Sequence, residues 1–235
     1  MNGREVAQRL TDALGLETPP VALRFAEAAP AGVPEPAADV PSACSFWRTA
    51  EQGVFFAPAA AHYHCPIGAV TMGFDLPEGV QQELMAAVGL MNEAEYLSPA
   101  EPAQIPSTGK GAAGIVYGPL AAFPLDPDLV LLWLTPRQAM LVNEAAGGAR
   151  WTAEPLTVRG RPACAALPLA LSGERATLSL GCMGMRTFTE IADDRLLIVL
   201  PGEQAGALAE SLQAVAQANA RMQQYYLQKR AAFAP

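Results

Sequence analysis

The chain has 235 residues, of which 51% are hydrophobic, so it is long enough and apolar enough to bury a substantial core. Its formal net charge is −8, which argues against nucleic-acid binding because phosphate binding needs clustered Lys and Arg. Its apolar stretches are too short, or too often interrupted by Pro, to span a bilayer, and its charged start does not resemble a secretory signal. We therefore expect a cytoplasmic globular protein with reduced cysteines and with neither nucleic acid nor membrane as a partner.

The first residues predict a helix, a strand and a long loop. Residues 3–15 place apolar side chains at helical spacing, and the TPP sequence at 18–20 ends that helix. Residues 21–25 (VALRF) have the composition of a strand. Residues 26–42 are rich in Ala and Pro and have no period, which indicates a surface loop.

Short helices and an extended segment are predicted next. The sequence CSFWRTAEQG (44–53) favours a short helix, VFFAPAAAHYH (54–64) an extended chain, and CPIGAVTMGF (65–74) a second helical start. Residues 79–97 continue as an amphipathic helix. The Pro- and Gly-rich residues 98–114 form the best candidate boundary between two halves of the chain.

The rest of the chain predicts strands alternating with helices. Strands are expected at 114–120, 128–134, 176–181 and 196–200. Residues 135–148 predict a helix with Thr135 as N-cap, whereas 164–171 (CAALPLAL) fits a helix or a strand because Pro168 interrupts it.

These elements predict an α+β fold: a single domain, residues 1–235, made of two similar halves. The halves are residues 17–97 and 115–202, each with a few strands and covering helices. A long helix over residues 203–232 follows them. We expect this helix to join the interface of a homodimer.

The two halves share a repeated cysteine pattern. When Cys44 is aligned with Cys164, a glycine follows nine residues later in both copies, and an extended segment then leads to Cys65 or Cys182. Such self-similarity is typical of a duplicated unit that packs against its twin about a pseudo-two-fold axis. Equivalent cysteines would then approach each other near that axis.

The surroundings of the cysteines favour thiolates. Cys65 and Cys182 both lie where an extended segment turns into a helix, and helix N-termini offer free N–H groups and positive partial charge. Two arginines follow four residues after a cysteine and would add to that field, and two glycines leave backbone N–H groups accessible. These supporting residues are Arg48, Gly68, Gly184 and Arg186.

Four thiolates from two similar units correspond to the ligand set of an iron–sulfur cluster, here a 4Fe-4S cluster. Such a cluster would give the protein a redox or electron-transfer role with a redox partner. The compact C-x-x-C spacing of ferredoxins is absent, so the site would be assembled from distant loops. The expected ligands are Cys44, Cys65, Cys164 and Cys182.

Three alternatives stay open. In an extended segment His62 and His64 would point to the same face, which suits Zn, Cu or haem in a non-enzymatic metal or small-molecule binder with an apolar cleft. The 44/65 or 164/182 pair could form a disulfide in thiol redox chemistry. Finally, free cysteine is also an ordinary small core residue. No Ser-His-Asp or paired-carboxylate arrangement stands out, so no reaction is assigned.

An ordered set of motifs extends over about residues 17–202: PPVALRF, CSFWRTA, CPIGAVTMGF, GRPACA, GCMGMR and DDRLLIVLPG. In this order they resemble the family catalogued as domain of unknown function 169, found in archaea and bacteria. The resemblance implies a single domain and marks the four cysteines as family features, but it supplies no substrate. The HYH sequence before Cys65 lies outside the matching motifs.

Overall fold

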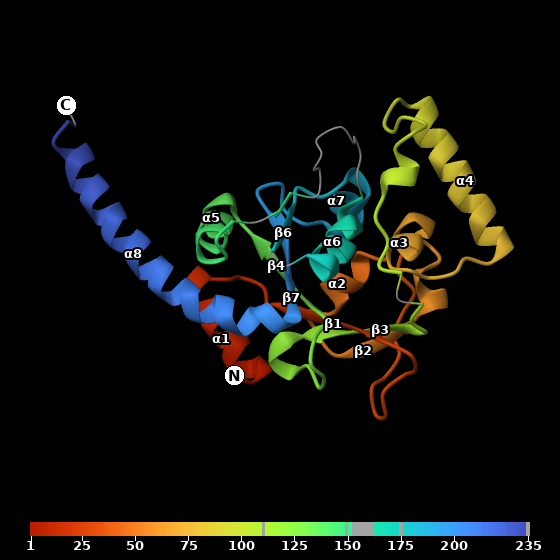
Figure 1. Ribbon diagram of the computed structural model, residues 1–235, viewed down its shortest axis with the longest axis horizontal. Coiled ribbons are helices and arrows are strands. Elements are labelled where there is room, and N and C mark those ends of the chain that lie inside the picture. Colours follow the sequence, from red (N-terminus) through yellow and green to blue (C-terminus); the bar gives the residue numbers. More distant parts are fainter. Residues whose placement is uncertain (110, 149, 152–161, 174–175, 234–235) are drawn as a thin grey trace.

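The computed structural model describes residues 1–109, 111–148, 150–151, 162–173 and 176–233. They form one seven-stranded sheet with helices on both faces (Figure 1). The predicted α+β fold, a single domain with a long C-terminal helix, is confirmed. Among these residues no helix is both long enough and apolar enough to cross a bilayer.

The strands and their covering helices fall into two units. The first unit contains β1 (Val21–Ala26), α2 (Ser45–Thr49), β2 (Phe55–Pro58), η1 (Ala59–His62), α3 (Pro66–Thr71), α4 (Glu78–Glu93), η2 (Pro102–Gln104) and β3 (Gly114–Pro119). The second contains β4 (Leu129–Leu134), α5 (Pro136–Ala145), β5 (Arg150–Trp151), η4 (Ala163–Ala165), α6 (Ala166–Ser172), β6 (Thr177–Ser179), α7 (Met183–Thr189) and β7 (Leu196–Pro201). Outside the units lie α1 (Gly3–Leu14), η3 (Leu120–Ala122), η5 (Gly202–Gln204) and α8 (Ala205–Ala231).

The strand order repeats in the two units. The sheet runs β2-β3-β1-β4-β7-β6-β5, so β2-β3-β1 of the first unit is mirrored by β6-β7-β4 of the second. The antiparallel pair β1 and β4 joins the units at the centre. In each unit a cysteine-bearing helical segment precedes the equivalent strand, β2 or β6, and another follows that strand.

The boundary between the units differs from the expected one. The Pro- and Gly-rich residues 98–114 predict a boundary that puts β3 in the second half. In the structure β3 pairs with β1 along its whole length, from Val21 opposite Pro119 to Ala26 opposite Gly114. The first unit therefore extends to residue 119, and the connection between units is residues 120–128. Pro and Gly mark loops, and a loop need not be a boundary between units.

Local chemistry explains the ends of α1 and the start of α5. The side chain of Thr135 accepts a hydrogen bond from the backbone N–H of Gln138, in a capping box that starts α5 as predicted. α1 has the same arrangement between Asn2 and Glu5, and it ends at Gly15, whose φ is 64°.

Two segments differ from the extended or ambiguous chain that the sequence favoured. Residues 54–64 are extended only over β2, because Pro58 is followed by the 3₁₀ turn η1. The ambiguous residues 164–171 are helical, in η4 and α6. Pro168 lies in the first turn of α6, where a backbone N–H is not needed for the helix.

The sheet has a core on each face. β4 is buried along its whole length: Leu129, Leu131 and Trp133 enter one core, and the residues between them enter the other. The helices α2, α3, α6 and α7 cover the first face, which we call the cysteine face because all four cysteines pack there. The opposite face is covered by α1, α5 and the start of α8.

Candidate functional site

All four cysteines lie in or directly before helical segments on the cysteine face. Cys44 is the N-cap residue of α2, Cys65 of α3 and Cys182 of α7. Cys164 lies in η4, directly before α6. The predicted helix starts after Cys65 and Cys182 are confirmed, but only Cys182 follows extended chain, since Cys65 follows the 3₁₀ turn η1. All four are free thiols, so neither expected disulfide pair is formed.

The cysteines of the two units meet in one hydrophobic core. Cys44 and Cys164 are buried members of this core, and Cys65 and Cys182 pack against it. The contacts cross between units: α2 lies against α7, and α3 lies against η4. The Ser45 hydroxyl donates to the carbonyl of Phe188 across the first of these contacts, with a distance of 3.4 Å. The pseudo-two-fold arrangement therefore places each cysteine-bearing segment against one from the other unit.

The thiols affect one another's pKa values through their charges. Burial raises the pKa of Cys44 to about 12, and thiolate charges on Cys65 and Cys182 raise that pKa as well. Burial is also the main cause that raises the pKa of Cys164, followed by charges on Cys65, Cys182 and Cys44. The pKa of Cys65 is raised by burial and then by the charge on Cys182. The raised pKa values of Cys44, Cys65 and Cys164 disfavour their thiolates, and a nearby positive charge would offset that effect.

Polar groups contact each sulfur. Oγ of Ser42 lies 2.9 Å from Sγ of Cys44, and the backbone N–H of Met185 donates to Sγ of Cys182 over 3.4 Å. Cys65 receives the backbone N–H groups of Gly68 and Ala43, which lower its pKa and partly offset burial. The Thr71 hydroxyl donates to the carbonyl of Ile67 over 2.7 Å, and its contact with Cys164 of the other unit lowers the pKa of that thiol. Donors to sulfur stabilise a thiolate, and backbone N–H groups supply such donors to Cys65 and Cys182.

The sequence did not indicate that the hydroxyls of Ser42 and Thr71 contact cysteines. A Ser two residues before a cysteine was an available signal. No pattern could have indicated Thr71, because it reaches Cys164 from the other unit across the core.

Of the two expected supporting glycines, only Gly68 lies where the packing leaves no room for a side chain. A Cβ at Gly68 would lie 3.0 Å from Cβ of Ala43 and 3.1 Å from Sγ of Cys65, so a side chain would press on the site. A Cβ at Gly184 would lie at an ordinary 4.0 Å from Sγ of Cys182.

The two expected arginines hold the helices in place. Arg48 forms an ion pair with Glu51, one turn further along the chain. Arg186 donates to the carbonyl oxygens of Leu180 and Arg195, at 2.6 and 3.1 Å. These contacts tie α7 to the ends of its neighbouring strands.

The two histidines lie in different surroundings, so the expected same-face pair is not formed. His64 is exposed, whereas His62 is fully buried, with 0% exposure. Nδ1 of His62 lies 3.0 Å from the carbonyl of Pro58 and therefore donates, and Nε2 accepts from the hydroxyl of Tyr117 at 2.9 Å. Burial lowers the pKa of His62 to about 4. Both ring nitrogens are occupied in a neutral imidazole, as in a core histidine.

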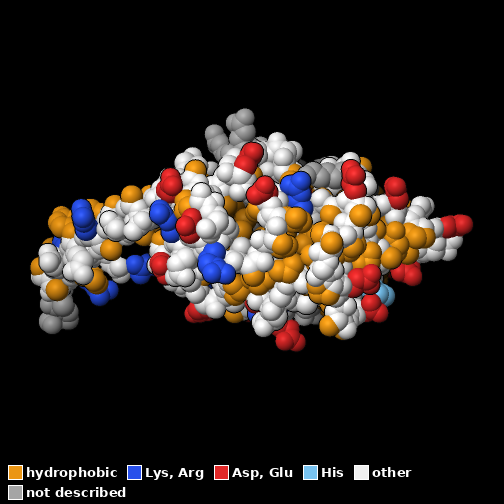
Figure 2. Space-filling model, turned by 90° about the horizontal axis from the view of Figure 1, so that it is seen from below, with side chains coloured by type: hydrophobic (Ala, Val, Ile, Leu, Met, Phe, Trp, Pro, Cys, Tyr) orange, Lys and Arg blue, Asp and Glu red, His pale blue; other side chains and the backbone are white. Residues whose placement is uncertain are grey.

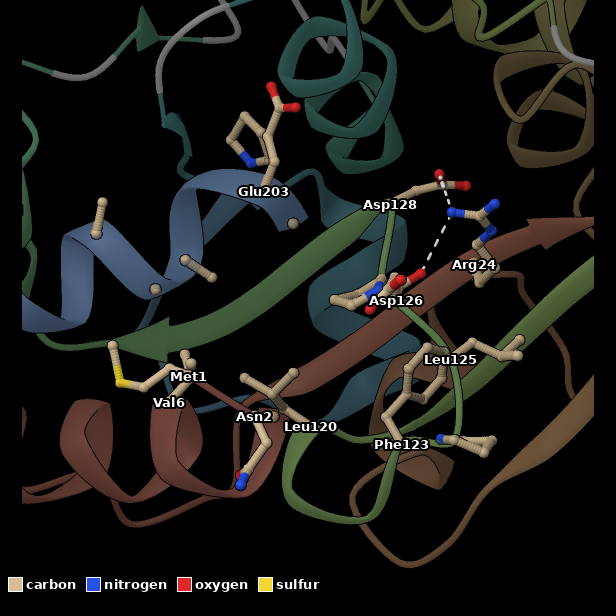
Figure 3. A pocket seen from close by; sticks show the side chains of 18 of the residues that line it. Met1, Asn2, Val6, Arg24, Leu120, Phe123, Leu125, Asp126, Asp128 and Glu203 are labelled. Carbon is tan, nitrogen blue, oxygen red and sulfur yellow. Dashed lines mark hydrogen bonds and ion pairs between the residues drawn. The ribbon is translucent and has the colours of Figure 1, made fainter.

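A cavity of about 1170 Å³ lies away from the cysteines, between the start of α1, the connection between units and the start of α8. Its charged lining residues are Arg24, Asp126, Asp128, Glu203 and Glu210. Arg24 turns toward Asp128, with Nη1 3.2 Å from Oδ1, and also donates to the carbonyl of Asp126 (Figure 3). No cysteine or histidine is among the described residues that line it. This polar cleft is separate from both predicted sites.

Within the described ranges no group of three or more His, Cys, Asp or Glu side chains could hold a metal ion. One tetrahedral zinc ion would require sulfur atoms about 3.8 Å apart, from its Zn–S bond length. The four thiols share a core and an electrostatic environment, but they do not form a compact single-ion site.

A comparison with protein families matches residues 9–211 to the family described as DUF169, uncharacterised ArCR. No curated protein and no solved structure is significantly similar to the chain. The match includes both units and all four cysteines, and it ends within α8. The chain therefore belongs to the DUF169 family, as its motifs indicated.

Proposed function

We propose that the protein binds an iron–sulfur cluster, of the 4Fe-4S type, through Cys44, Cys65, Cys164 and Cys182. When bound, the cluster would supply one-electron redox chemistry. This chain would hold it between its two units, donate hydrogen bonds to the cysteine sulfurs and exclude water from the buried side.

The observation that carries the proposal is the crossed packing of the two units. α2 of the first unit lies against α7 of the second, and α3 lies against η4, so two cysteines from each unit share one core. An independent structural role for each cysteine would not require the four to gather. Burial and neighbouring thiolate charges raise the pKa values of Cys44, Cys65 and Cys164, and a positive centre between the units would lower them.

A cluster fits the site better than a single ion. The described side chains lack a compact group for a metal ion, whereas a four-iron cluster binds each thiolate to a different iron atom and so spreads the four sulfurs apart. The backbone N–H groups of Gly68, Ala43 and Met185 already point to sulfurs, and such donors tune cluster potentials.

A redox partner would approach from the side of α7. Cys182 is half-buried, and exposed apolar side chains lie beside it: Leu180, Met183 and Phe188. Exposed apolar groups next to a redox centre suit a transient protein contact, in which a small dry patch brings the two centres close.

The alternative, a small-molecule or metal binder of the Zn, Cu or haem type that uses His62 and His64, has less support. His62 has both ring nitrogens bonded inside the core, and His64 lies on the surface. The two side chains would have to leave different environments to act together.

The test is anaerobic purification followed by reconstitution with ferrous iron and sulfide. We expect a brown protein with about four irons and four sulfides per chain and with visible absorption that bleaches on reduction. Cys44→Ala, Cys65→Ala, Cys164→Ala and Cys182→Ala should each lose most of the iron, while circular dichroism shows that the fold is kept.

His62→Gln and His64→Gln serve as matched controls, and both should keep full iron content. A colourless wild-type protein that takes up no iron under these conditions would overturn the proposal. Metal loss in the histidine variants together with retention in the cysteine variants would favour the alternative.

A further inference from the structure

Helix α8 has two parts with different surroundings. Its buried residues, Ala205, Leu208, Ala209 and Leu212, all lie in its first eight positions. Residues 213–233, which we call the arm, project from the rest of the chain and end at the C-terminal tip (Figure 1). A helix of 27 residues is about 40 Å long, so the arm reaches well beyond the sheet.

The arm continues the apolar seam that anchors the start of α8. Residues alternate at spacings of four and three along one side of the helix: Leu208, Leu212, Val215, Asn219, Met222 and Tyr226. This is the spacing of a coiled-coil seam, in which one polar residue such as Asn fixes the register. The first three pack on the core, but Met222 is 47% and Tyr226 60% exposed. Within one chain the first half of the seam is packed and the second half is exposed.

A groove lies beside the exposed part of the seam. It has a volume of about 870 Å³ and runs between the arm, α5 and the end of α1. Its apolar lining residues include Leu14, Met140, Leu141, Met222, Tyr226 and Leu227. Hydrogen bonds join the arm to α5, from Arg137 to Gln223 and from Asn219 to Glu144. Arm and groove are thus neighbouring apolar surfaces on the same side of the molecule.

The charge of the arm is opposite to that of the rest of the chain. The arm carries three basic side chains, Arg221, Lys229 and Arg230, and no acidic one. Since the whole chain has a net charge of −8, the remaining residues carry −11. Figure 2 shows Lys and Arg gathered on the projecting helix, with Asp and Glu spread over the body. The charged residues that line the groove, Arg137 and Arg230, are basic as well, so the charge of the arm complements the acidic body of another copy outside the groove. An anionic membrane would repel that body.

The exposed apolar area of the arm is a large part of what a dimer interface buries. Met222, Tyr225, Tyr226, Leu227 and Phe233 are between 42% and 82% exposed, which leaves roughly 550 Å² of apolar surface at about 200 Å² for each side chain. A stable interface buries about 800 Å² from each partner. The arm supplies about two thirds of that area, and the 44% exposed Met140 of the groove adds to it.

We propose that two copies of the chain form a two-fold dimer in which the arm of each packs into the groove between arm and α5 of the other. The contact is isologous, so the same arm and groove serve both copies and no further copy can add. Its apolar centre is Met222, Tyr226 and Leu227. The basic tips lie on the acidic body of the partner.

The test is sedimentation of the full-length protein over a hundredfold range of concentration. Wild type should be a dimer, and its dissociation constant should rise with salt because the charge attraction is screened. A variant with Met222→Glu and Tyr226→Glu places two charges in the seam and should weaken the dimer by about 100-fold.

The matched control carries Gln224→Glu and Gln228→Glu, which add the same charge on the opposite side of the helix. Its dissociation constant should stay within about threefold of the wild-type value. Both variants change exposed residues, so circular dichroism should show unchanged helix content. A wild-type monomer at every concentration overturns the proposal, as does a seam variant that dimerises like the control. A monomer that co-sediments with phosphatidylserine vesicles would instead assign the arm to a membrane surface.

Discussion

The two units agree in their thiols and differ in what surrounds them. The first cysteine of each unit is buried, with Cys44 9% and Cys164 7% exposed, and the second, Cys65 or Cys182, is half-buried. Each unit therefore offers one deep and one shallow sulfur at the shared core. The strand order repeats in the same way.

The two units differ in their buried polar residues and in their inserted helices. Three residues before the second cysteine, the first unit has His62 and the second has Ser179, and both are buried. The first unit adds α4, none of whose residues is buried, whereas the second adds α5, which packs on the core of the opposite face. The repeated strands and helices thus position the sulfurs, while the inserted helices and the polar core residues are particular to each unit. The expected effects below decrease in size.

The largest effect concerns His62, because Ser179 at the equivalent position of the second unit does not titrate. Its pKa is about 4 when folded because of burial, against about 6.5 when unfolded, so the unfolded chain binds the proton first as the pH falls. The stability contribution is complete above pH 6.5 and is lost as the pH falls toward 4, by about 3 kcal/mol. Urea unfolding between pH 7 and 4 measures this loss.

His62→Gln should remove most of this pH dependence, because an amide bonds in the core without titrating. His64→Gln, at the exposed histidine two residues later, should leave the dependence as in wild type. An unchanged slope in the His62 variant would show that other groups cause the acid sensitivity.

The next effect compares the glycines that follow the second cysteine of each unit. Gly68→Ala should lower the free energy of unfolding by about 2 kcal/mol, because its Cβ would press on Ala43 and on the sulfur of Cys65. Gly184→Ala meets nothing closer than 3.9 Å and should raise stability by about 0.5 kcal/mol through helix propensity. Equal effects in chemical denaturation would mean that the two sites are packed alike.

The smallest effect tests the helix inserted in the second unit. Thr135→Ala removes the N-cap of α5 and should cost about 1 kcal/mol. Thr187→Ala, in the exposed part of α7, removes only a bond to a carbonyl one turn back and should change stability by at most a few tenths of a kcal/mol. Thermal unfolding of both variants makes the comparison, and a Thr135 variant as stable as wild type would contradict the capping role.

Much of the fold follows from local sequence. The strands of β4 and β7, the capped start of α5 and the long α8 were all predictable, because apolar period and capping residues act over a few neighbouring positions. The repeat of cysteine, glycine and cysteine likewise indicated two similar units. The family membership rests on the same short motifs, taken in order.

Three features were decided only by tertiary structure. β3 belongs to the first unit because it pairs with β1, and the composition of residues 98–114 gives no sign of that pairing. Burial made His62 a core residue bonded to Tyr117, although HYH looked like a metal-binding pair. The four thiols share one core because β1 and β4 pair antiparallel, which packs α2 on α7 and α3 on η4. Sequence spacing specifies each local segment, but only the sheet sets which segments far apart in the chain come into contact.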